Sequence, residues 1–109
     1  MTAPKFTIGQ IIDHEMFGYR GVIVDIDPSF QGNNFQGGVS SFKKPSILNP
    51  TNQSPWYRVL VDRADYDTYV AERHLTLSTD YSPIQHPKLW FYFEALKNQI
   101  YVTRAQSLN

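Results

Sequence analysis

Short stretches in which apolar and polar residues alternate are the feature that most constrains the fold of this chain. Val22, Val24 and Ile26 recur at every second position, with the polar Asp25 between the last two. That period places the three apolar side chains on one face of a β-strand and the carboxylate on the other. Pro28 then ends the strand, because proline has no N–H to donate to a neighbouring strand. We expect a half-buried strand here.

The same alternation recurs later in the chain. Tyr57, Val59 and Val61 alternate with other residues, and Leu60 between them indicates that the second face of this strand is also partly covered. Further short strands are predicted over residues 10–14, 66–72, 74–77 and 100–102. Short strands joined by hairpins, with few helix signals, predict a mainly β fold. We expect a small antiparallel barrel, since closing a sheet removes its exposed edges.

Residues 28–55 form a long stretch without periodicity, rich in proline, glycine, serine and asparagine. A structureless loop of that length inside a compact domain is unusual and is often functional. This one carries large apolar residues, among them Phe30, Phe35 and Phe42. Two interpretations stay open: these side chains pin the loop to the barrel, or they form a partner-binding loop.

The stretch from Lys88 to Lys97 has helical potential. Leu89, Phe93 and Leu96 are spaced as i, i+4 and i+7, which places them on one face of a helix. We therefore expect a short C-terminal helix or turn as an extension of the β fold.

Composition excludes several classes of protein. The 109 residues, which we expect to form one domain over 1–109, include ten basic and ten acidic side chains, so strong sequence-independent attraction to nucleic acid is not indicated. Cysteine is absent, which excludes disulfides and cysteinyl zinc sites. No secretory signal is recognisable, and the longest apolar run, residues 89–93, is too short to cross a bilayer. We expect a cytoplasmic protein that does not contact a membrane.

No residue pattern points to catalysis. His14, His74 and His86 lack the spacing of metal ligands, and we expect them to be surface or capping residues. Asp25 and Asp27 could share a strand face and hold a divalent cation, but no further oxygen ligands follow at a supporting spacing. We therefore predict neither an enzyme nor a metal or cofactor site.

Aromatic residues beside cations are the remaining candidates for function. The candidate binding residues are Tyr19, Arg20, Phe42, Lys43, Lys44, Arg58 and Arg73. On a barrel surface such residues could stack on bases and contact phosphates. They could equally form a protein-recognition surface, where Tyr, Trp and Arg are enriched. A third alternative is that the rings pack the core and the cations are solvated.

Several motifs in order along the chain resemble one known family. These are Arg20-Gly-Val-Ile-Val-Asp-Ile-Asp-Pro28, Pro55-Trp-Tyr-Arg-Val-Leu-Val61 and Tyr69-Val-Ala-Glu-Arg-His-Leu75. Together they resemble the hemimethylated-DNA-binding domain family, which includes the bacterial heat-shock protein Q group, over roughly residues 5–102. Relative to that pattern, residues 29–55 contain no acidic residue, and the Asp/Gly-rich turn expected near residues 96–99 is missing.

The resemblance implies a small SH3-like β-barrel without catalytic activity. It also implies two kinds of partner. The family name implies double-stranded DNA methylated on one strand, and the heat-shock group implies an accessory or adaptor role toward ATP-dependent proteases in protein quality control. Homo-oligomerisation through the same aromatic surfaces is a further alternative.

Overall fold

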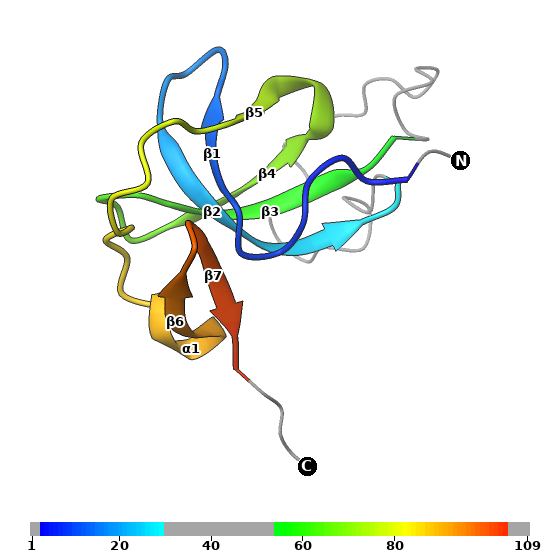
Figure 1. Ribbon diagram of the computed structural model, residues 1–109. Helices are drawn as coiled ribbons and strands as arrows, with labels where there is room; N and C mark the ends of the chain where they lie inside the picture. The colour runs from blue at the N-terminus through cyan, green and yellow to red at the C-terminus, as the bar shows by residue number, and fades with distance from the viewer. Residues whose placement is uncertain (1–2, 30–53, 105–109) are drawn as a thin grey trace.

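The computed structural model describes residues 3–29 and 54–104 (Figure 1). In chain order the elements are β1 Ile11–His14, β2 Arg20–Asp27, β3 Trp56–Val61, β4 Asp67–Ala71, the 3-10 helix η4 Glu72–His74, β5 Leu75–Leu77, α1 Leu89–Tyr92, β6 Phe93–Lys97 and β7 Ile100–Thr103. The prediction of a mainly β protein is confirmed, and each predicted strand has a counterpart. Within these residues no helix has the length and apolar character that crossing a bilayer requires.

Five of the strands form one antiparallel sheet in the order β4-β3-β2-β1-β5. The register places Ile11 of β1 opposite Val22 of β2, and Val22 opposite Leu60 of β3. The sequence predicts a closed barrel, but in the described part of the chain the two outer strands, β4 and β5, do not pair with each other. They are consecutive along the chain and are separated by the helical turn of η4. What is observed is an antiparallel sheet without closure.

Apolar side chains cover both faces of this sheet. One cluster contains Ile11, Val22, Val24, Leu60, Ile84, Leu89, Phe93 and Tyr101, and the other contains Phe6, Ile12, Ile23, Tyr57, Val59, Val70 and Leu75. The pairing of β2 with β3 shifts register between Ile23 and Asp25, which marks a β-bulge. Because a bulge adds one residue to a strand, Ile26 packs against the cluster of Ile23. The predicted single-face stripe is therefore right for Val22 and Val24 and wrong for Ile26.

The C-terminal segment forms a helical turn and a hairpin instead of the helix predicted over residues 88–97. α1 is only four residues long, and Phe93 takes up an extended backbone with φ −127° and ψ 156°. β6 then pairs with β7 through a turn in which Asn98 (φ 53°) and Gln99 (φ 71°) are both left-handed, as in a type I′ hairpin. Leu89 and Phe93 still pack together, since both side chains enter the same cluster, but they reach it from a helical turn and a strand and not from one helix.

Gly18 permits a turn, and Gly21 permits a close strand crossing. Gly18 has a positive φ of 76° between β1 and β2. Gly21 lies where β2 packs closely on β3: a Cβ there would lie 2.5 Å from the Val59 Cγ1 and 2.6 Å from the Leu60 carbonyl oxygen. Because any other residue would collide with backbone here, only glycine lets the two strands approach.

Candidate functional site at the His14 turn

The predicted site residues that the structure describes do not form one cluster. Phe42, Lys43 and Lys44 lie outside the described residues. The others are Tyr19, Arg20, Arg58 and Arg73, and they have three different surroundings. Arg20 is enclosed by the fold, and Arg58 is paired with Asp67. Tyr19 lies beside His14, and Arg73 precedes His74, whose ring stacks on that of His14.

Arg20 of β2 uses its side chain to hold the fold. Its Nη1 donates to the carbonyl oxygens of Asp80 and Ser82 at 2.9 and 2.8 Å, and its Nη2 lies 3.1 Å from the Asp62 carboxylate. The side chains of Arg20 and Asp62 are only 12% and 9% exposed. A guanidinium whose donors are engaged in this way has little left to offer a phosphate. Its contacts tie the segment 80–83 to the sheet.

Arg58 of β3 lies between acidic and aromatic side chains. Its Nη1 is 3.5 Å from the Asp67 carboxylate, and its guanidinium carbon is 5.7 Å from the centre of the Tyr69 ring. Tyr69 donates its hydroxyl hydrogen to Asp27 at 2.7 Å, and its ring centre is 5.2 Å from that of Trp56. The Asp67 carboxylate therefore shares the charge of Arg58, which weakens the attraction of this face for phosphate.

Residues 14–19, which we call the His14 turn, connect β1 to β2 and are tightly hydrogen-bonded. The Nδ1 of His14 accepts the backbone N–H groups of both Met16 and Phe17, each at 3.1 Å. The N–H of Gly18 donates to the His14 carbonyl oxygen at 2.8 Å. One imidazole therefore satisfies two backbone donors that the turn would otherwise leave unpaired.

The His14 ring is buried among other rings. It stacks on His74 of η4, with 5.6 Å between ring centres and 11° between planes, and lies 5.0 Å from the Tyr19 ring. The Tyr19 hydroxyl shares a 2.8 Å hydrogen bond with the Thr68 hydroxyl, which fixes the ring. Burial, followed by the charge of His74, lowers the pKa of His14. The nearby Glu15 carboxylate acts in the opposite direction, but its effect is smaller. The neutral ring, whose Nδ1 can accept hydrogen bonds, is therefore favoured.

The fold brings Arg73 next to this turn. Arg73 belongs to η4, and the residue after it, His74, both stacks on His14 and accepts the N–H of Glu15 at 2.8 Å. In Figure 1 the β1–β2 connection and the segment between β4 and β5 accordingly lie side by side. Arg73 is exposed, and it takes part in none of the ion pairs found over residues 3–29 and 54–104. Its charge is available to a ligand.

The carboxylate beside Arg73 in the sequence is engaged by the fold. Glu72 accepts the Tyr57 hydroxyl hydrogen at 2.5 Å and the backbone N–H of Lys5 at 2.8 Å. Burial, followed by the hydrogen bond to Glu72, raises the pKa of Tyr57 to about 12, so the hydroxyl stays a donor. Glu72 thus attaches the N-terminal segment to η4.

Met16 and Phe17 stand out in the structure, although the sequence assigns them no role. They are 65% and 74% exposed, whereas most large apolar side chains of the described residues are buried or half-buried. The only sequence signal for them is an adjacent apolar pair before Gly18, between two predicted strands. For His14, the expected capping role is confirmed by its hydrogen bonds, but the ring is buried and not on the surface.

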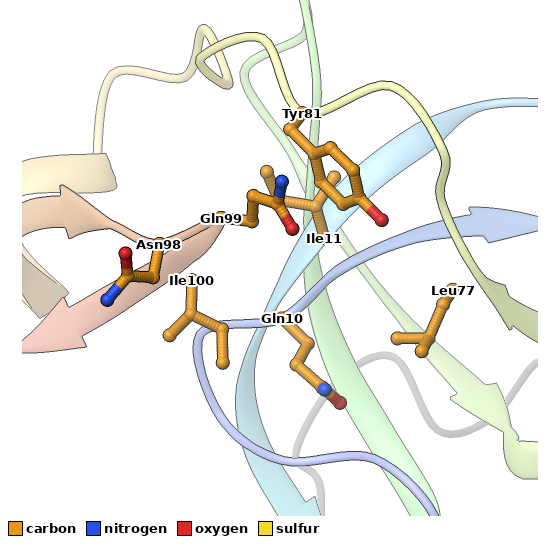
Figure 2. Close-up of a pocket in the computed structure, with 7 residues that line it drawn as sticks. All are labelled: Gln10, Ile11, Leu77, Tyr81, Asn98, Gln99 and Ile100. Atoms are coloured by element: carbon orange, nitrogen blue, oxygen red, sulfur yellow. The ribbon is translucent and has the colours of Figure 1, made fainter.

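A separate hollow of about 160 Å³ lies where β1, the end of β5 and the β6–β7 turn meet. Figure 2 shows its lining: Gln10, Ile11, Leu77, Tyr81, Asn98, Gln99 and Ile100. None of these side chains carries a charge, and none of the predicted site residues is among them. The hollow therefore has no charged side chain to attract a phosphate or a metal ion.

The acidic pair of β2 is used within the fold. Asp27 accepts the Tyr69 hydroxyl hydrogen, and Asp25 accepts the N–H of Ile26 at 3.0 Å. In the part of the chain that the structure describes, no group of three or more His, Asp or Glu residues is arranged to hold a metal ion.

One comparison with known proteins bears on this arrangement. Residues 4–100 match the family model described as "YccV-like: Hemimethylated DNA-binding protein YccV like". The matched range includes β1 to β6, the His14 turn and η4. It also includes the segment that carries Phe42, Lys43 and Lys44.

Proposed function

The chain belongs to the YccV-like family of hemimethylated-DNA-binding proteins, and from this we propose that it is a non-catalytic module that binds double-stranded DNA methylated on one strand. The family match over residues 4–100 is the observation that carries the proposal. The structure supports it with an exposed cation, Arg73, held next to a rigid turn.

Arg73, Lys43 and Lys44 are the proposed phosphate-binding residues. Phosphate contacts supply most of the affinity of such modules, and each phosphate that the protein neutralises releases counterions. Tyr19 and Phe42 are the proposed aromatic contacts to the DNA, where an apolar surface can pack against a methyl group in the major groove. Arg58 contributes less, because Asp67 already shares its charge. Arg20 is assigned to the fold and not to the ligand.

The test is a titration of the full chain with hemimethylated, unmethylated and fully methylated duplexes of one sequence. We expect micromolar or tighter binding that weakens with salt, with a log–log slope of about −0.9 for each phosphate contacted. One extra buried methyl group contributes about 0.8 kcal/mol, so we expect about fourfold preference for the hemimethylated duplex over the unmethylated one. The absence of salt-sensitive binding to all three duplexes would contradict the proposal.

Two variants locate the surface. Arg73→Ala should weaken binding to every duplex and make the salt slope shallower by about 0.9, because it removes one phosphate contact. Arg63→Ala is the matched control, since Arg63 is also exposed but lies on the turn after β3, beside Asp62. An equal loss from both variants would show that overall charge, and not the η4 surface, determines affinity.

A second candidate function is favoured by a different part of the molecule. Trp90 and Phe91 of α1 are 52% and 74% exposed, and exposed aromatic side chains are characteristic of protein-recognition surfaces. This surface suits the adaptor role toward ATP-dependent proteases that the heat-shock group implies.

Degradation of a model substrate by a purified ATP-dependent protease tests this role. We expect the chain to change the degradation rate, and the double variant Trp90→Ala/Phe91→Ala to lose that effect. Met16→Ala/Phe17→Ala is the matched control for removal of apolar surface elsewhere. An unchanged degradation rate with the wild-type chain would count against an adaptor.

A further inference from the structure

Met16 and Phe17 are held outward by a turn that is already ordered. Besides the two hydrogen bonds to the His14 Nδ1, the N–H of Glu15 donates to the His74 carbonyl oxygen at 2.8 Å. The Phe17 ring lies 4.7 Å from that of His14. Since the backbone of the turn is fixed by these contacts, a ligand that meets the two side chains has little ordering entropy to overcome.

We propose that Met16 and Phe17 form an apolar wedge that inserts between neighbouring base pairs of bound duplex DNA. This inference rests on the proposed function. Phenylalanine and methionine are among the side chains that other DNA-binding proteins insert between base steps. Insertion partly unstacks the step and kinks the duplex, and the cost is offset by apolar burial and by the additional contacts that the bend allows.

One exposed cation lies near the wedge and can contact a phosphate. Arg73 of η4 is exposed, and the next residue, His74, holds the turn through its ring and its carbonyl oxygen. The Glu72 carboxylate before Arg73 is occupied by the Lys5 backbone N–H and by the Tyr57 hydroxyl. The carboxylate on the turn itself, Glu15, is exposed.

A cation beside two adjacent apolar side chains matches what a kinked duplex presents. The unstacked base step is narrow and apolar, and phosphates lie on both sides of it.

The experiment measures DNA bending. A duplex of about 25 base pairs carries a donor and an acceptor dye at its two ends, and energy transfer is recorded as the full chain is added. Inserted wedges kink DNA by about 20 to 90°, so we expect energy transfer to rise with the wild-type chain. The double variant Met16→Ala/Phe17→Ala should lose this rise and bind about tenfold more weakly. Its salt slope should stay unchanged, because no phosphate contact is removed.

Two control variants separate the wedge from its surroundings. Trp90→Ala/Phe91→Ala removes two other exposed side chains, those of α1, and should leave both the bending of DNA and the affinity for DNA unchanged. Glu15→Gln removes the carboxylate of the turn and should raise affinity about twofold to threefold at low salt, because a like charge no longer faces the phosphates.

The outcomes distinguish the wedge from the proposed function. Salt-sensitive binding of the wild-type chain to an unbent duplex overturns the wedge and leaves the DNA-binding proposal standing. The absence of binding overturns both. The wild-type bending measurement needs no variant, so the absence of bending overturns the wedge even where the double variant fails to fold.

Discussion

At Arg20 a single guanidinium joins β2 to the turn after β3 and to segment 80–83. The planar group suits this task because its N–H donors point in fixed directions and several of them can be used at once. An ammonium group carries the same charge but cannot reproduce that fork. Arg20 and Asp62 are therefore a geometric pair as much as an electrostatic one.

Replacing Arg20 by lysine should lower the free energy of unfolding by about 2 to 3 kcal/mol. The reason is that the largely buried Asp62 carboxylate and the carbonyl oxygens of Asp80 and Ser82 lose donors. Urea denaturation measures the change. The matched variant is Arg63→Lys. The Nε of Arg63 lies 3.9 Å from the same carboxylate, but the Arg63 side chain is 74% exposed. That variant should change stability by less than about 0.5 kcal/mol.

His14 makes stability depend on pH with a definite sign. Its pKa is lower in the folded protein than the usual value of about 6.5. As pH falls, the unfolded chain therefore takes up this proton first, which favours unfolding. The stability contributed by neutral His14 is complete above about pH 6.5 and is lost as pH falls from there through the folded pKa.

We expect the wild-type free energy of unfolding to decline between about pH 6.5 and pH 5 more steeply than that of His14→Asn. The asparagine oxygen can accept the N–H groups of Met16 and Phe17 without titrating. Urea denaturation at a series of pH values gives both slopes. The neighbouring residues Glu15 and His74 are present in both proteins. Identical slopes would assign the titration to a group other than His14.

The β6–β7 hairpin depends on a turn that its own residues disfavour. Type I′ turns need a positive φ at both central positions and prefer asparagine followed by glycine. Asn98 suits the first position, but Gln99 occupies the second with φ 71°. A side chain in this left-handed region costs about 1 to 2 kcal/mol.

Gln99→Gly should therefore raise the free energy of unfolding by about 1 kcal/mol. The control is Lys97→Gly at the end of β6, where the backbone is extended and glycine should lower it by about 0.5 to 1 kcal/mol. Thermal and urea denaturation of the two variants measure both changes. A lower free energy of unfolding for both variants would rule out the left-handed turn.

An element can be predicted from the sequence when the pattern that indicates it lies within the element itself. The strands are predictable because alternation is a local property, and Leu60 even indicates that β3 is covered on both faces. β6 is not predictable in the same way, because the spacing of Leu89 and Phe93 fits a helix as well as a turn and a strand. The bulge in β2 leaves no mark in the sequence, so Ile26 was assigned to the wrong face.

The candidate site is less predictable than the fold, because the role of each residue depends on contacts with residues far away in the sequence. Arg20 and Arg73 look alike in the sequence. The partners that engage Arg20 lie 42, 60 and 62 residues away. Only the folded chain shows that one arginine is occupied and the other exposed, and only the folded chain shows what holds Met16 and Phe17 in place.

The sheet and the C-terminal hairpin share one of the two apolar clusters. Phe93 and Tyr101 pack with Ile11, Val22 and other sheet residues. Tyr101 is also tied in by hydrogen bonds, since its hydroxyl accepts the N–H of Ile84 at 2.9 Å. The described parts of the chain should therefore unfold together in one transition.

Phe93→Ala should destabilise the whole molecule by about 3 to 5 kcal/mol, because it opens a cavity under the sheet. Trp90→Ala, three residues earlier and 52% exposed, should cost less than about 1 kcal/mol. Circular dichroism in the far and near ultraviolet follows the two transitions. A Phe93→Ala protein in which the near-ultraviolet signal is lost while the sheet persists would show that the hairpin folds independently.

Homo-oligomerisation stays a prediction for the molecule as a whole. Light scattering of the wild-type chain and of Trp90→Ala/Phe91→Ala measures it directly. A mass above that of one chain in the first protein and not in the second would assign the contact to α1.

The N–H of Tyr101 donates to the carbonyl oxygen of Gly9 at 2.9 Å, so an early segment is held by one of the latest. During translation, the nascent chain must carry Ile11 and Val22 uncovered until Tyr101 has left the ribosome. Contacts between such distant positions form slowly, and the uncovered apolar surface is prone to aggregate while it waits. Synthesis of this chain therefore includes an interval in which the uncovered apolar surface is accessible to a holding chaperone.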